Sequence, residues 1–196
     1  MPENKLPLIR DNQDKRDNYA RQVRRYQRAV REGFYLEALV IDCAMLEDRL
    51  RAALFHMGLV EDREAEKLRA SIKPFVKQTA GETGVKNISC VIRMIKGVLL
   101  WAAETDGDYE HDRYLTALKA QCESADVDVY VESLDEAADW LKSRNDVIHA
   151  LMRRSPDGME ARLKDIAEIG RRLANEMDTL VRLIKRGGRA RRAAGL

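Results

Sequence analysis

Apolar residues recur at spacings of three and four along most of the chain, which predicts amphipathic helices rather than strands. Only 4 of the 196 residues are proline and 11 are glycine, so long stretches contain no helix breaker. We expect helices over residues 14–31, 35–56, 63–71, 88–103, 109–122 and 159–185, with a loop at 79–87 and a turn at 106–108. Long helices joined by short loops predict an all-α fold, an antiparallel helical bundle of four to five core helices plus short extra helices.

Another long helix is expected in the last third of the chain. Residues 126–131 alternate weakly between apolar and polar positions, which predicts a short strand or an extended link before this helix. Ser133 is predicted to start the helix, because Ser133 and Glu136 have the spacing of a capping box. Residues 156–158, Pro-Asp-Gly, are predicted to end it.

The length fits one domain with its own core, with expected boundaries at 1–13 for an N-terminal extension, 14–185 for the bundle and 186–196 for a basic disordered tail. The last twelve residues carry five basic side chains and no acid. Such a tail could contact nucleic acid without specificity, or it could serve only solubility.

Three cysteines without a CxxC spacing suit a reducing compartment and argue against a zinc site. The longest apolar run, 98–103, is far shorter than the roughly 20 residues that span a bilayer. We therefore expect a soluble cytoplasmic protein with no membrane partner, no metal site and no cofactor.

The helix after Ser133 combines an apolar stripe with three polar residues. Asn145 is predicted to lie near the middle of the stripe, and Arg144 and His149 on its two borders, about 140° apart around the helix axis. Polar groups on a buried stripe are costly unless they are paired or functional. The stripe consists of Leu134, Ala138, Leu141, Ile148 and Met152.

Glu47 is predicted to interrupt the apolar stripe of helix 35–56. That stripe consists of Leu36, Val40, Cys43, Leu50 and Leu54. A buried carboxylate needs a partner, for which Arg144 is the first candidate and His149 the second. A purely structural Glu47–Arg144 pair remains the alternative to a functional site.

Arg144, Asn145 and His149 have the chemistry needed to cleave RNA. Arginine binds the scissile phosphate and stabilises transition-state charge, histidine transfers protons near neutral pH, and asparagine orients either group. RNA supplies its own nucleophile, the 2′-hydroxyl, so neither metal nor cofactor is required. Because cleavage needs two proton-transfer groups, we expect a twofold homodimer whose composite site takes one His149 from each subunit.

Arginine outnumbers lysine 24 to 11, which mildly favours partners that carry phosphate. Four of these arginines, Arg21, Arg24, Arg25 and Arg28, fall on one face of the first helix. We predict that this face binds nucleic acid, with a salt-bridged helical surface as the alternative.

The segment Arg144-Asn145-Asp146-Val147-Ile148-His149 resembles the motif of the HEPN family, in which an arginine, often followed by a polar residue, precedes a histidine after four to six residues. The resemblance implies an all-α domain and a metal-independent RNase that acts as a dimer in toxin–antitoxin or phage-defence systems, with an antitoxin or regulatory protein as partner. It also implies that Arg144 and His149 are catalytic and Asn145 supporting. Glu47 looks like the acid on an earlier helix of several members.

Arg51 to His56 fits the same spacing, but Ala52 fills the polar slot, so we expect no site there. Leu151 stands where some toxins of the family carry a modifiable tyrosine, which argues against neutralisation by that route and against a toxin role specifically. Two alternatives stay open: a catalytically silent relative that binds RNA or nucleotides, and a helical adaptor that recognises protein, in which Glu47 and Arg144 would form a closed internal pair.

Overall fold

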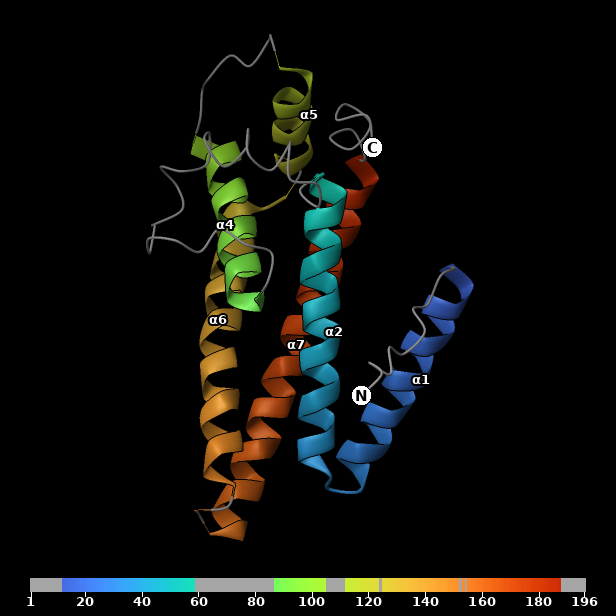
Figure 1. Ribbon diagram of the computed structural model, residues 1–196, viewed down its shortest axis with the longest axis vertical. Coiled ribbons are helices and arrows are strands. Elements are labelled where there is room, and N and C mark those ends of the chain that lie inside the picture. The colour runs from blue at the N-terminus through green and yellow to red at the C-terminus, as the bar shows by residue number, and fades with distance from the viewer. Residues whose placement is uncertain are drawn as a thin grey trace, which may run out of the picture.

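The computed structural model describes residues 12–58, 87–104, 112–123, 125–151, 153 and 155–187. These residues form an all-α bundle without strands, as the sequence predicts (Figure 1). Its helices are α1 (Asn12–Arg31), α2 (Tyr35–Met57), α4 (Ile88–Glu104), α5 (Arg113–Cys122), α6 (Val127–Ala150) and α7 (Pro156–Gly187).

Helix α7 is the element around which the bundle is built. In Figure 1 it runs obliquely from beside the C-terminal end of α6 toward the C-terminal end of α2. Helix α2 packs against it most extensively, α6 packs against both α7 and α4, and α1 lies on the outer side of α2. No helix in the described ranges is long and apolar enough to cross a membrane.

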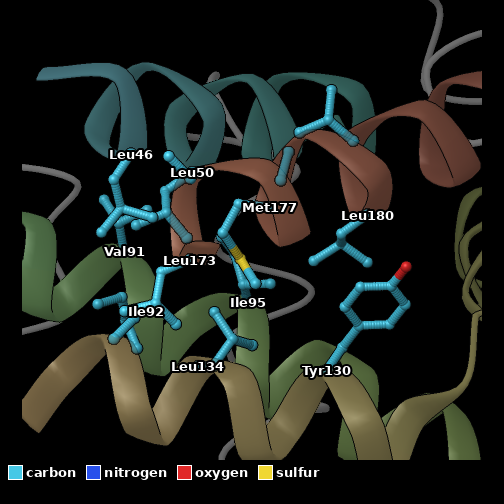
Figure 2. Close-up of a cluster of buried hydrophobic side chains, with 14 of the residues drawn as sticks. Leu46, Leu50, Val91, Ile92, Ile95, Tyr130, Leu134, Leu173, Met177 and Leu180 are labelled. Atoms are coloured by element: carbon cyan, nitrogen blue, oxygen red, sulfur yellow. The ribbon is translucent and has the colours of Figure 1, made fainter. Parts of the chain in front are cut away.

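The core lies where α2, α4, α6 and α7 meet (Figure 2). Each of these helices contributes side chains that are almost fully withdrawn from water, and burying a side chain of this size contributes about 1.5–3 kcal/mol. The labelled members are Leu46, Leu50, Val91, Ile92, Ile95, Tyr130, Leu134, Leu173, Met177 and Leu180. Because α7 packs against α2, α5 and α6, its placement constrains that of the other helices.

Two glycines end the first two helices at the predicted places. Gly33 has a φ of 78° and joins α1 to α2, and Gly58 has a φ of 83° and caps α2. Its N–H bonds the carbonyl oxygens of Leu54 and Phe55. A residue with a side chain is strained at such positive φ values, so the glycine at each position indicates where the helix ends.

Helix α6 touches α7 closely because position 170 is glycine. The Trp140 indole of α6 donates Nε1–H to the Ile166 carbonyl oxygen at 2.7 Å. A Cβ atom on Gly170 would lie 2.4 Å from Cζ2 of Trp140. The indole therefore rests directly on the backbone of α7, one turn before Arg144 on its own helix.

The predicted strand at 126–131 and the predicted helix start at Ser133 are both wrong. Helix α6 begins at Val127, capped by Asp126, whose carboxylate accepts from the Val129 amide at 3.4 Å. Ser133 is buried in the middle of the helix. Burial of Tyr130 on the core face decides this segment, because tertiary packing overrides the strand preference of its valines.

Other boundaries move by a few residues. Asp112 caps α5, so that helix begins at Arg113 rather than at residue 109. Residues 156–158 form the first turn of α7, where proline is favoured at the start of a helix, and α7 extends through residue 187 into the predicted tail. The predicted helix 63–71, the turn 106–108, nearly all of the loop 79–87, and residues 1–11 and 188–196 lie outside the described residues.

Replacement of Gly170 by alanine is expected to destabilise the protein by about 1–3 kcal/mol, the usual cost of overpacking a core. The new methyl group would collide with the Trp140 ring, which the Ile166 hydrogen bond holds in place. Urea unfolding monitored by circular dichroism gives the free energy.

Gly158→Ala is the matched control, because a Cβ atom there meets nothing within 4 Å. Alanine is favoured over glycine in a helix by up to about 1 kcal/mol, so this variant should be as stable as the wild type or more so. A Gly170→Ala protein that gains stability like the control would contradict the packing described for α6 and α7.

Candidate functional site

The three motif residues of α6 lie on its surface or at its edge. Arg144 is half-buried, whereas Asn145 and His149 are exposed. Arg144 Nη1 donates to Asn145 Oδ1 at 2.7 Å. Arg144 and Asn145 are thus in contact, and the structure does not bring His149 to them within one chain.

The buried face of α6 differs from the predicted stripe. Asn145 is exposed rather than central, and Arg144 continues the buried line between Trp140 and Val147. The large Trp140 side chain turns the helix so that its own side, and not that of Ile148, faces the core. The buried residues are Tyr130, Ser133, Leu134, Ala137, Trp140, Leu141 and Val147.

The Arg144 guanidinium reaches toward α2. Its Nε atom is buried and has no hydrogen-bond partner among the described residues. An unsatisfied buried donor costs about 1–3 kcal/mol, more when it is charged. The cation also acts electrostatically on the Cys43 thiol of α2. Arg144 therefore stands at the junction of α2 and α6 with part of its hydrogen-bonding capacity unused.

Glu47 does not pair with Arg144, so that prediction is wrong. Its Oε1 accepts from Arg51 Nε at 2.9 Å and from Arg51 Nη2 at 2.8 Å, one turn along α2. Glu47 is partly exposed to water, so its ion pair with Arg51 of the same helix costs little desolvation. The Glu47 carboxylate nevertheless acts electrostatically on the Cys43 thiol, as the Arg144 guanidinium does, so both charges lie near Cys43.

The setting of Cys43 disfavours the thiolate form that a nucleophile needs. Burial raises the pKa of its thiol. The Arg144 guanidinium acts in the opposite direction and lowers this pKa, whereas the Glu47 carboxylate raises it further. A thiol with a raised pKa carries little thiolate at neutral pH. The chemistry available at this junction is therefore that of the guanidinium and the Asn145 amide.

The predicted apolar stripe of α2 is also wrong at its N-terminal end. Leu36 is 40% exposed and Val40 is 52% exposed, and both lie on the helical face that carries Cys43 and Glu47. Helix α2 is apolar on nearly every side, so periodicity does not single out its buried face. Packing against α7 buries Leu39 and Leu46 instead, whereas Leu50 and Leu54 are buried as predicted.

Asp42 is the buried acid of α2, and sequence reasoning missed it. Its side chain is 0% exposed and lies 3.5 Å from Arg171 of α7, with no hydrogen bond to either carboxylate oxygen. Arg171 also stacks on the Tyr26 ring of α1, 4.6 Å from its centroid. The sequence does indicate that Asp42 is buried. It follows Leu39 by three residues and precedes Leu46 by four, which places the three side chains on one face of the helix.

The arginines predicted to bind nucleic acid, Arg21, Arg24, Arg25 and Arg28, are all exposed on α1. Arg25 bonds Glu37 of α2 at 2.8 Å. Their role remains a prediction. Within the described part of the chain, no group of three or more His, Cys, Asp and Glu side chains is placed to hold a metal ion.

Comparison of the chain with protein-family models, with curated proteins and with solved structures gave no match. The resemblance to the HEPN family therefore stays a prediction from the six residues of the motif.

Asp42 should make stability depend on pH. Burial raises the pKa of its carboxyl from 3.8 to about 7, although Arg171 opposes the rise. Between these two values the folded protein binds the proton more tightly than the unfolded chain, so unfolding free energy falls as pH rises from about 4 to about 7. Urea titrations across this range should show that fall in the wild type and a weaker one in Asp42→Asn.

The difference between the two proteins isolates Asp42, because their other titrating groups are shared. At pH 8 the variant should be the more stable one, since it no longer buries a charge. Equal pH slopes for both proteins would show that Asp42 is already ionised near its ordinary value and paired with Arg171.

Proposed function

We propose that the protein is a metal-independent endoribonuclease whose site is built from Arg144, Asn145 and His149 and completed by a second copy of the chain. The observation that carries the proposal is the state of Arg144. Its guanidinium is held beside α2 with a buried, unsatisfied Nε, next to an exposed amide and an exposed imidazole on the same helix. Arg144 as a whole is only half-buried, and a phosphate oxygen is the natural acceptor for its accessible N–H groups.

Cleavage at such a site forms one bond between oxygen and phosphorus and breaks another. The ribose 2′-oxygen attacks phosphorus, the bond from phosphorus to the 5′-oxygen breaks, and the products carry a 2′,3′-cyclic phosphate and a 5′-hydroxyl. One imidazole takes the 2′-hydroxyl proton and another gives a proton to the leaving 5′-oxygen. Arg144 stabilises the charge that develops on the phosphoryl oxygens, and Asn145 positions its guanidinium through the 2.7 Å hydrogen bond.

A second copy supplies what one chain lacks. Each chain has one His149, and in the single chain it is exposed away from Arg144. The neighbouring face of α2 leaves Leu36 and Val40 exposed, which gives a homodimer apolar surface to bury. A twofold axis near α6 would place both imidazoles at one phosphate. The cellular role in defence or toxin–antitoxin systems, and a regulatory protein partner, follow from the family resemblance alone.

One observation favours a second candidate, an RNA-binding protein that does not cleave. Arg144 is engaged by its own neighbour Asn145, and among the described residues neither of them forms a hydrogen bond with His149. Such a protein would hold RNA without needing the imidazole. Loss of His149 separates the two functions, because it abolishes cleavage but leaves binding in place.

The direct test is incubation of purified protein with total RNA in EDTA. We expect fragments that end in 2′,3′-cyclic phosphate. Rates should fall by about 10²- to 10⁴-fold in His149→Ala, the usual loss for a proton-transfer group, and by at least a similar factor in Arg144→Ala. Specific activity should also fall on dilution, as dimers dissociate.

Lys142→Ala is the matched control, because Lys142 is an exposed cation on the same helix that pairs only locally with Asp139 at 2.7 Å. It should cleave like the wild type. Equal rates for His149→Ala and the control, or undiminished specific activity in a dilute monomer, would rule out the composite site.

A further inference from the structure

A basic cleft lies at the other end of the bundle from Arg144 and His149. It has a cavity volume of about 930 Å³ and is formed by the N-terminal half of α1 and the C-terminal halves of α2 and α7. In Figure 1 the C-terminal ends of α2 and α7 lie at the top and the N-terminal half of α1 lies to their right, whereas α6 ends at the bottom. Six lysine and arginine side chains line the cleft against two aspartates: Lys15, Arg16, Arg49, Arg51, Arg182 and Lys185 against Asp48 and Asp178.

The floor of the cleft is fixed by a network that joins all three helices. Arg49 of α2 stacks on the Tyr19 ring of α1, 4.2 Å from its centroid, and bonds Asp178 of α7 at 2.9 Å. The Tyr19 hydroxyl donates to Asp48 at 2.9 Å. Burial and the adjacent Asp48 raise the pKa of Tyr19, so the phenol stays neutral. The two aspartates are therefore occupied in holding the cationic floor together.

The rim of the cleft carries the charge that remains. Lys15, Arg16, Arg182 and Lys185 are all exposed. Asp178 is shared between Arg49 and Arg182, and Asp48 between Tyr19 and Lys15, so the carboxylates do not balance the cations. A concave surface with such an excess attracts polyanions.

An aromatic ring is placed among these cations. Phe55 lines the cleft, is 40% exposed, and packs edge-on against the His56 ring at 5.3 Å between centroids. Exposed aromatic rings next to cations are the arrangement by which proteins hold unpaired bases and their phosphates together. An acidic protein surface would use the cations but would gain much less from an exposed phenyl ring.

We propose that this cleft binds single-stranded nucleic acid, with phosphates along the Arg16 and Lys185 rim and a base stacked on Phe55. The site is separate from the proposed ribonuclease centre and does not depend on it. It also differs from the arginine face of α1 that the sequence suggests, because Arg21, Arg24 and Arg28 do not line the cleft. Arg16 and Lys185 lie outside the floor network, so their replacement leaves that network intact.

Fluorescence anisotropy with a labelled 12-nucleotide RNA tests the proposal, using the full chain in the His149→Ala background so that the probe is not cut. Arg16→Gln/Lys185→Gln should weaken binding about tenfold at low salt and should reduce the salt slope by about 1 to 2. Arg162→Gln/Lys164→Gln removes the same charge from exposed positions in the N-terminal half of α7, outside the cleft, and should change both little. Equal losses in the two double variants would overturn the cleft as the site.

The aromatic part has its own matched pair. Phe55→Ala should weaken RNA binding by at least about fivefold, as loss of one stacking platform does. Phe34→Ala removes a phenyl ring that is 57% exposed outside the cleft, and it should bind like its parent. Thermal melts confirm that each variant is folded.

Competitors decide the class of ligand. Single-stranded DNA of the same sequence should displace the RNA within about tenfold of RNA itself, because phosphates and base faces are common to both. A duplex, or polyglutamate of equal charge, should displace it at least tenfold less well. Displacement by polyglutamate as strong as that by RNA would show a general anion surface and overturn the proposal.

Discussion

The contact of Trp140 with Gly170 is the constraint on which the rest of the structure depends. It lets α6 approach the α7 backbone closely, and it fixes the rotation of α6 through the Ile166 hydrogen bond. The next residues of α7 extend the same junction, because Arg171 reaches Asp42 of α2 and Tyr26 of α1, and Arg172 bonds Glu136 of α6. One turn of α7 thus connects α1, α2 and α6.

That junction explains the placement of the polar residues at the candidate site. With Trp140 turned inward, Arg144 one turn later follows the buried line and reaches the side of α2, while Asn145 and His149 face outward. The result is a guanidinium anchored at a helix junction beside two adaptable polar groups. Under the proposed function, RNA and a second copy of the chain complete this arrangement.

The sequence predicts the all-α fold and most helix ends because these depend on local signals. Two of the few glycines mark the ends of α1 and α2, where Gly33 and Gly58 take positive φ values. The motif of Arg144, Asn145 and His149 is likewise readable as a local pattern. Apart from the segment that begins α6, the predictions that fail concern which side of a helix is buried. Helices α2 and α6 each have several faces that are apolar enough to be buried. Packing against α7, which is distant in sequence, determines which face is buried.

The same limit explains Glu47, Asp42 and the basic cleft. Glu47 looked buried only because Leu36 and Val40 were assigned to the core, and Asp42 was overlooked for the same reason. The cleft brings together cations from α1, α2 and α7 that no spacing in the sequence relates. The residue pattern along one helix predicts which side chains that helix carries on each face, whereas a site between helices depends on how the helices pack.

The most direct test of the composite site is the activity of mixed dimers. Wild type and His149→Ala are mixed in equal amounts, left to exchange subunits, and assayed on RNA at constant total protein. If both imidazoles serve one site, only dimers with two intact chains cleave, so activity falls to about one quarter of the wild-type value. Activity of about one half would show that each chain works alone and would contradict the account.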